Sequence, residues 1–202
     1  MTLPAQAKAI LDTWFGDIDA SGQVAPELSA RWFSKSAEFD EYLRQRFASL
    51  IPVAMDGQCD SCLMIPQGRL ALIILLDQFS RNVFRDTPQM FAADAVCQAL
   101  VADGMALGHD QTLCSVQLPF FYMPLMHAED LVLQDQLLAI AEQLLATAKP
   151  NDIARLSNFQ HFAKLHRDII ARFGRFPHRN VLLGRESSVE EVAFLKEPNS
   201  SF

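Results

Sequence analysis

The spacing of apolar residues, which is helical along nearly the whole chain, constrains the fold most strongly. Residues 5–15 place Ala7, Ile10, Leu11 and Trp14 at the three- and four-residue intervals of one helix face. No run shows the alternating polarity of a β-strand, and no residue pair typical of a β-hairpin turn occurs. The pattern therefore predicts an all-α fold.

Proline, glycine and capping residues mark where the predicted helices begin and end. Pro52 is expected to kink or end one helix, Pro66 to open the next, and Gly108 and Gly174 to stop two others. The stretch "SSVEE" has the pattern of a capping box, in which Ser188 caps a last helix. About eight helices, packed in antiparallel pairs, are predicted: 5–15, 37–56, 67–79, 88–107, a short one within 111–125, 128–148, 152–173 and the last from Ser188.

Chain length and linker composition predict one all-helical domain over residues 1–202. The linkers are too short to separate two domains, and residues 1–9 and 197–202 are expected to be loose ends. The stretch 67–79 is apolar all round, which predicts a central, buried helix. Half of the residues are apolar and a fifth are charged, as in ordinary globular proteins.

Charge and motif content exclude several classes of function. A net charge of −7 argues against nucleic acid as the main partner, because phosphate neutralisation needs surplus basic residues. The longest apolar run, "LALIILL", is too short to span a membrane, and no basic leader precedes an apolar core, so a cytoplasmic location is expected. Cys59 and Cys62 form one C-x-x-C without the second pair of a zinc site. No metal, cofactor or common nucleotide motif is predicted, and the oligomeric state is left open.

Acidic and basic residues are divided between two parts of the chain. Residues 86–148 contain eight acidic residues and no lysine or arginine, whereas residues 153–185 contain seven basic residues and one acid. The simple interpretation is that the arginines pair within the molecule. The basic residues from 167 to 185 are all arginine, however, and guanidinium groups form forked hydrogen bonds to carboxylate or phosphate. A site for an anion is the alternative interpretation.

Two further polar clusters interrupt the apolar pattern. In "LLDQFSRNVFR", Asp77 ends a run that is expected to be buried, so its carboxylate must be protonated or paired. The candidate partners are Arg81, four residues on, Arg85 and an arginine of the 172–185 loop. In "YMPLMHAEDL", His127 stands at the entrance of the predicted helix 128–148, with Glu129 and Asp130 in its first turn. His127 is interpreted either as a helix-terminal residue or as a proton carrier that Glu129 orients.

The stretch "RFGRFPHRN" adds a second candidate histidine. His178 lies between Arg175 and Arg179, whose positive charges are expected to lower its pKa and keep it neutral at pH 7. His166 falls on the apolar stripe of the predicted helix 152–173 and is interpreted as a core residue. Asn82 and Asn180 each follow an arginine and are expected to cap turns or to contact a ligand.

The segments "LDQFSRNVFR", "YMPLMHAEDL" and "RFGRFPHRNVLLGRESSVEE" together resemble the bacterial family called domain of unknown function 924, from about Ile10 to Leu195. Ser80 stands where that family has proline, and Ala128 where it has serine. The resemblance implies a tetratricopeptide-like right-handed superhelix, and by fold analogy a groove for a peptide or protein. It implies no established activity.

The sequence leads to one hypothesis and two alternatives. The hypothesis is a shared pocket that binds a small anionic molecule or a peptide. The first alternative is a structural ionic clamp in a protein-interaction module, and the second is an enzyme with His127 or His178 as acid or base. The predicted ligand-binding residues are Asp77, Arg81, Asn82, Arg85, His127, Glu129, Arg172, Arg175, His178, Arg179, Asn180 and Arg185.

Overall fold

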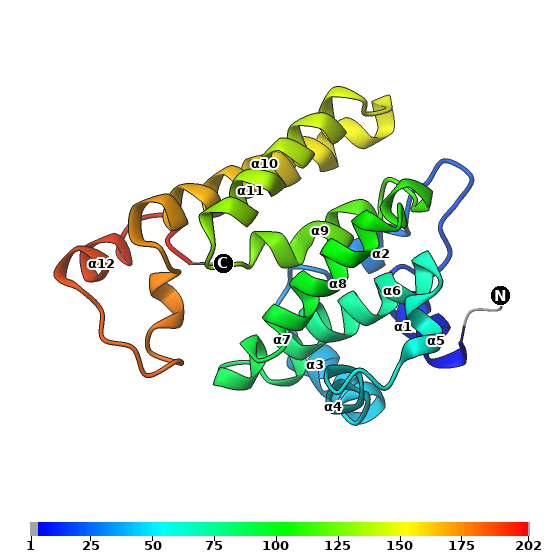
Figure 1. Cartoon of the computed structure of the whole chain (residues 1–202), viewed down its shortest axis with the longest axis horizontal. Helices are drawn as coiled ribbons and strands as arrows, with labels where there is room; N and C mark the ends of the chain where they lie inside the picture. Colours follow the sequence, from blue (N-terminus) through cyan, green and yellow to red (C-terminus); the bar gives the residue numbers. More distant parts are fainter. Residues whose placement is uncertain (1–3, 202) are drawn as a thin grey trace. The chain divides into compact units, whose positions relative to one another are not determined.

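The computed structural model describes residues 4–201, and within this range it contains helices and turns but no strand (Figure 1). The all-α prediction is therefore confirmed for the described residues. The α-helices run from α1 to α12, so the prediction of about eight was too low. Part of the difference arises because some of the predicted helices are interrupted and form two shorter helices.

The chain divides into two compact units, each of which is described by itself. Unit 1 comprises residues 1–85 and 89–124, and unit 2 comprises residues 86–88 and 125–202. The single domain over residues 1–202 stays a prediction. Of its expected loose ends, residues 1–3 and 202 lie outside the described residues. Residues 5–9 belong to α1, where Ala7 is buried, and Ser200 is buried too, so both loose ends are shorter than expected.

Unit 1 contains most of the short helices. They are α1 (Ala5–Trp14), α2 (Pro26–Ser29), α3 (Ala37–Phe47), α4 (Leu50–Met55), α5 (Asp60–Leu63), α6 (Pro66–Ile73), a π-helical segment η1 (Ile74–Phe79), α7 (Ser80–Val83), a 3₁₀ turn η2 (Pro88–Phe91), α8 (Asp94–Ala106), a 3₁₀ turn η3 (Asp110–Thr112) and α9 (Leu118–Met126). A unit boundary falls within η2, after Pro88, and another within α9, after Pro124.

The core of unit 1 surrounds α6 and η1. Every residue from Leu70 to Phe79 is buried, which confirms the central helix that its all-round apolar sequence predicts. The rings of Trp14 and Phe120 pack edge to face, with centroids 5.5 Å apart, and Trp14 also contacts Phe79. The helical path continues through α7 to Val83, beyond the predicted end at 79, and this continuation holds Asp77 and Arg81 on one helical run.

Two predicted helices of unit 1 have different bounds in the structure. The helix expected over 37–56 is interrupted at residues 48–49, so that Pro52 lies in the first turn of α4, where its missing N–H leaves no helical bond unmade. The helix expected over 88–107 begins only at Asp94, because Pro88 opens a 3₁₀ turn instead. Gly108 follows α8 with φ +68°, as expected for a stop signal.

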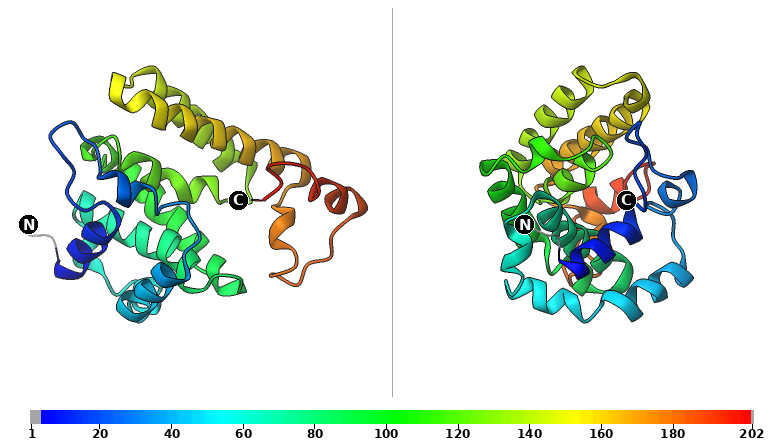
Figure 2. Two further views of the ribbon diagram at one scale, coloured as in Figure 1. Left: turned by 180° about the vertical axis from the view of Figure 1, so that it is seen from behind. Right: turned by 90° about the vertical axis from the view of Figure 1, so that its right-hand side faces the viewer.

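Unit 2 contains two long helices and a C-terminal segment. Its elements are α10 (Leu131–Ala146), a 3₁₀ turn η4 (Pro150–Asp152), α11 (Ile153–Phe173), a 3₁₀ turn η5 (Pro177–Arg179) and α12 (Val189–Phe194). The helices α10 and α11 lie side by side, as both Figure 1 and Figure 2 show. Gly174 ends α11 with φ +69°. Ile169 and Ile170 from the last turns of α11 form an apolar cluster with Phe176 and Phe194.

The start of α10 corrects the prediction for 128–148. Asp130 is the N-cap residue, and its carboxylate accepts hydrogen bonds from the backbone N–H groups of Val132 (2.8 Å) and Leu133 (3.4 Å). His127 and Glu129 therefore precede the helix rather than stand at its entrance or in its first turn. The predicted capping box is present at α12: Ser188 accepts from the N–H of Glu191, whose carboxylate accepts from the N–H of Ser188.

Candidate functional site

Asp77 and Arg81, both predicted site residues, form an ion pair in the core of unit 1. The Asp77 side chain has no solvent exposure, and its Oδ1 lies 3.1 Å from Nη1 of Arg81. Nη2 of the same guanidinium donates to Asp94 Oδ1 at 2.9 Å, so one arginine pairs with two carboxylates. The predicted i,i+4 pair is thus present, and Asp94 at the start of α8 is a partner that sequence spacing did not indicate.

Arg85 and Asn82 share another carboxylate of unit 1. Nε and Nη2 of Arg85 donate to the two oxygens of Asp40 at 2.6 and 2.8 Å, and Asn82 Nδ2 donates to Oδ1 at 2.7 Å. Burial raises the pKa of Asp40, but the hydrogen bonds from Arg85 and Asn82 outweigh it, and the pKa lies below its ordinary value. Asn82 therefore serves this pair instead of capping a turn.

Arg185 and Glu129 form the corresponding pair of unit 2. Nη1 and Nη2 of Arg185 donate to Oε2 and Oε1 of Glu129 at 2.6 and 2.9 Å, and the backbone N–H of Phe176 donates to Oε1 at 2.8 Å. Burial raises the pKa of Glu129, but these hydrogen bonds lower it further than burial raises it. Asn180 accepts from Nε of Arg185 at 2.9 Å and holds the guanidinium from its other side.

Arg175 and Arg172 bind the carboxylates of α12. Arg175 donates through Nε and Nη2 to the two oxygens of Glu191 at 2.7 and 2.8 Å, and the hydrogen bond from Arg175 lowers the pKa of Glu191 to about 2. Arg172 donates to Glu190 at 2.9 Å, where both side chains are largely exposed. Exposed pairs of this kind contribute only about 0–1 kcal/mol.

Arg179 is buried among rings. Only 6 % of its surface is exposed, its guanidinium carbon lies 4.6 Å from the centroid of the Phe176 ring, and Nη2 donates to the backbone carbonyl of His127 at 3.0 Å. The contact with Phe176 is a cation–π interaction, which is strongest where water is excluded. Arg179 thus connects the segment before α10 to the η5 turn.

Two histidines, His166 and His178, lie beside the Phe176 ring, and a third, His127, lies beside His166. The ring centroids of His127 and His166 are 6.4 Å apart, and those of His166 and His178 lie 5.5 and 5.6 Å from the Phe176 ring. Burial, followed by the charge of His127, lowers the pKa of His166 to about 3. Burial, followed by the charge of Arg179, lowers the pKa of His178 to about 4. The predicted direction for His178 is confirmed, although burial contributes more than its arginine neighbours.

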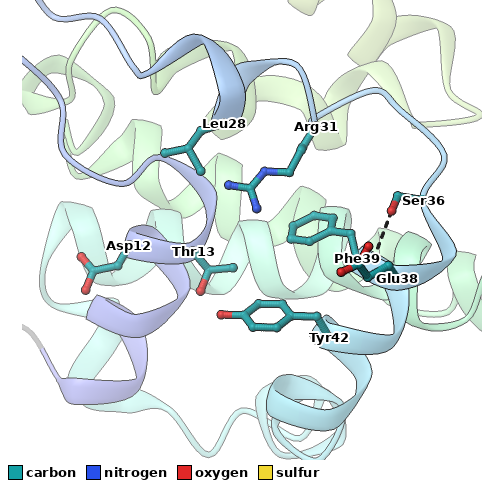
Figure 3. Close-up of a pocket in the computed structure, with 8 residues that line it drawn as sticks. All are labelled: Asp12, Thr13, Leu28, Arg31, Ser36, Glu38, Phe39 and Tyr42. Atoms are coloured by element: carbon teal, nitrogen blue, oxygen red, sulfur yellow. Dashed lines mark hydrogen bonds between the residues drawn. The ribbon is translucent and has the colours of Figure 1, made fainter.

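Unit 1 contains a cavity that the sequence did not indicate (Figure 3). Its volume is about 500 Å³, within the range typical of small-molecule sites, and its lining comes from α1, α2 with the turn after it, and α3. The lining residues are Asp12, Thr13, Leu28, Arg31, Ser36, Glu38, Phe39 and Tyr42.

Arg31 is the basic residue of this cavity. Its guanidinium carbon lies 5.2 Å from the centroid of the Phe39 ring, and among residues 4–201 it forms no ion pair. Glu27, four residues earlier, would be an ordinary helical partner, but α2 ends at Ser29, so Arg31 lies beyond the helix. Only the observed end of α2 distinguishes Arg31 from a paired surface arginine, and sequence spacing therefore could not find it.

The predicted residues thus form two groups. Asp77, Arg81, Asn82 and Arg85 lie in unit 1, while the other eight lie in unit 2. Each unit is described by itself, so the one pocket shared by both groups stays a prediction. Within residues 4–201, no group of three or more His, Cys, Asp or Glu side chains is placed to hold a metal ion. Over the same residues, no helix is both long and apolar enough to cross a membrane.

The fold defines an all-α protein with arginine–carboxylate pairs at its helix ends, and comparison with known proteins gives its family. Residues 10–199 match the family described as "Bacterial protein of unknown function (DUF924)", and the chain belongs to this family. It is similar to the solved "Structure of Protein of Unknown Function ATU0120 from Agrobacterium tumefaciens", with 36 % identity and a TM-score of 0.79 over 95 % of this chain and 97 % of that one. A search of curated proteins found no match.

Proposed function

We propose that this protein binds a small anionic molecule, a carboxylate or a phosphate, in the cavity that Arg31 lines. The observation that carries the proposal is that the Arg31 guanidinium reaches into a cavity of about 500 Å³ without an ion-pair partner among the described residues. Guanidinium forms forked, charge-assisted hydrogen bonds with such anions. Thr13 and Ser36 add hydroxyl groups to the same lining.

The four paired arginines of the predicted site are less suited to an anionic ligand. Carboxylates of this chain already occupy the forks of Arg81, Arg85, Arg175 and Arg185. An incoming anion would have to displace a hydrogen-bonded carboxylate and leave it uncompensated. These contacts support a second proposal, in which the predicted residues act as ionic clamps within each unit.

The clamp and the ligand site differ in what the Arg179→Ala substitution does. A clamp predicts that the free energy of unfolding falls by about 3–5 kcal/mol, because a buried cation and its partners are disrupted. A ligand site predicts little loss without ligand and no thermal shift when the anion is added. The enzyme alternative makes His127 or His178 the acid or base. An enzymatic activity that persists both when His127 is replaced and when His178 is replaced would exclude it.

Titration calorimetry with inorganic phosphate and with succinate tests the anion site. We expect Arg31→Ala to weaken binding at least about tenfold, the effect of losing hydrogen bonds to a charged group. The control is Arg172→Ala, which removes the same charge from an exposed position of unit 2. Equal binding by both variants and the unchanged protein would overturn the proposal.

The superhelical architecture and the cytoplasmic location, which the sequence predicts, form part of the same proposal. A tetratricopeptide-like superhelix of antiparallel helix pairs, in a cytoplasmic protein, is compatible with a small-ligand site. The net charge of −7 supports a locally recognised small anion over nucleic acid, because a polyanion would be repelled by the protein as a whole.

A further inference from the structure

Glu38 is a second unpartnered charge on the cavity that Arg31 lines. Its carboxylate forms no hydrogen bond or ion pair among the described residues, and it does not pair with Arg31. The other carboxylate of the lining, Asp12, is already neutralised by Lys8, whose Nζ lies 2.6 Å from Asp12 Oδ2. The cavity thus presents one free cation and one free anion from the described part of the chain.

An aromatic wall lies beside these two charges. The rings of Phe39 and Tyr42 are stacked, with centroids 6.1 Å apart and planes inclined by 13°, and Arg31 lies over Phe39. Leu28 adds aliphatic surface from α2 (Figure 3). A ligand that fits this lining carries an apolar or aromatic side chain as well as charge.

Hydroxyl groups complete the polar part of the lining. Ser36 Oγ accepts from the backbone N–H of Phe39 at 3.2 Å as the cap of α3, which leaves its hydroxyl hydrogen to donate. Tyr42 Oη accepts from Arg46 Nη1 at 2.7 Å and likewise keeps a hydrogen to donate. Both hydroxyls therefore favour an acceptor such as a carboxylate oxygen close to the ring wall.

We propose that the ligand is a zwitterion with an apolar side chain: an α-amino acid or a short peptide with free termini. Arg31 binds its carboxylate, Glu38 binds its ammonium group, and the wall of Phe39 and Tyr42 packs against its side chain. This inference rests on the proposed anion site, because it uses the same guanidinium. It adds the requirement for a cationic group, which an anion site alone does not need.

Four probes, two zwitterionic and two singly charged, test the proposal on the unchanged protein. They are L-phenylalanine, 3-phenylpropanoate (no ammonium), phenethylamine (no carboxylate) and the dipeptide of phenylalanine and leucine. We expect L-phenylalanine or the dipeptide to bind at least about tenfold more tightly than either singly charged probe. The zwitterion that binds more tightly identifies the source as a free amino acid or a peptide.

Two substitutions assign the charges to residues. Arg31→Gln should lower the affinity for the zwitterion to that of phenethylamine and leave phenethylamine binding unchanged. Glu38→Gln should lower the affinity for the zwitterion to that for 3-phenylpropanoate and leave 3-phenylpropanoate binding unchanged. Far-UV circular dichroism of both variants verifies that α1 to α3 remain folded.

The outcomes separate this proposal from the anion site. If 3-phenylpropanoate binds through Arg31 and neither zwitterion binds more tightly, the zwitterion is wrong and the anion site stands. If neither zwitterion nor 3-phenylpropanoate binds in an Arg31-dependent way, and phosphate and succinate also fail, both proposals are overturned.

Discussion

Arg31 in unit 1 and Arg185 in unit 2 have the same side chain, but Arg185 forms an ion pair and Arg31 forms none among the described residues. Arg185 donates to both oxygens of Glu129, which lies 56 residues away in the sequence, and to Asn180, which lies five residues away. Arg31 lies beyond the end of α2, over an aromatic ring and beside a cavity. The comparison teaches that an arginine-rich motif can be occupied by carboxylates of the chain itself, and the lack of such a partner for Arg31 within residues 4–201 is what supports the proposed anion site.

The largest expected effect is from breaking the Arg185–Glu129 pair. Glu129→Ala should lower the free energy of unfolding by about 3–5 kcal/mol, because it leaves Arg185 without its carboxylate and the Phe176 N–H without its acceptor. Urea denaturation measures the change. Glu142→Ala, at an exposed position on α10, is the control and should change stability by less than about 0.5 kcal/mol. Equally small losses of stability in the Glu129 and Glu142 variants would show that Glu129 does not act as a clamp.

Acidification should destabilise unit 2 through its buried histidines. The pKa of His166 is about 3 in the folded protein and about 6.5 unfolded, so its contribution is complete above pH 6.5 and is lost as pH falls toward 3. At pH 5 this loss is about 2 kcal/mol, since one pKa unit equals about 1.4 kcal/mol. His166→Gln should flatten the pH dependence of the melting temperature, whereas His161→Gln, exposed on the same helix, should not. An unchanged slope in His166→Gln would contradict the prediction.

A smaller effect is expected at the start of α12. Ser188→Ala removes the side-chain acceptor of the capping box and should lower stability by about 1 kcal/mol. It also loosens Glu191, the partner of Arg175, and so tests whether the cap supports that pair. Ser157→Ala, exposed within α11, should leave stability unchanged or raise it slightly through helix propensity. Thermal unfolding distinguishes the two, and a Ser188 variant as stable as the parent would show that the cap is dispensable.

The smallest effect on stability should accompany the largest effect on binding. Arg31→Gln removes no ion pair among the described residues, so the free energy of unfolding should change by less than about 0.5 kcal/mol. Differential scanning calorimetry without ligand measures this quantity. A loss comparable to that of Glu129→Ala would show that Arg31 is structural and would erase the contrast between the two arginines.

The sequence predicts those features that depend on near neighbours. The glycine that ends α11, the capping box of Ser188 and the buried run before Asp77 all follow from residues within a few positions of one another. The Asp77–Arg81 pair belongs to the same category, because four residues separate its members on one helical run. The lowered pKa of His178 also has the predicted direction.

Features that depend on distant residues could not be predicted. Asp40 pairs with Arg85 across 45 residues, and neither residue's surroundings in the sequence indicate the other. The cavity beside Arg31 exists because α2 ends after four residues and α3 supplies a ring wall, which is a matter of packing. The start of α10 was misplaced because Asp130 was interpreted as a first-turn acid, whereas its extended backbone makes it the cap.

The hydrogen bonds of Glu129 can form only after the residues that donate them have been synthesised. Its donors are Phe176 and Arg185, which leave the ribosome well after α10 and most of α11. A nascent chain that has reached only α11 therefore carries an anion whose cationic counterpart has not yet been made. Glu129 therefore gains its counter-ion only after Arg185 has been synthesised, and chains truncated before Arg185 should be less stable because Glu129 then lacks this guanidinium.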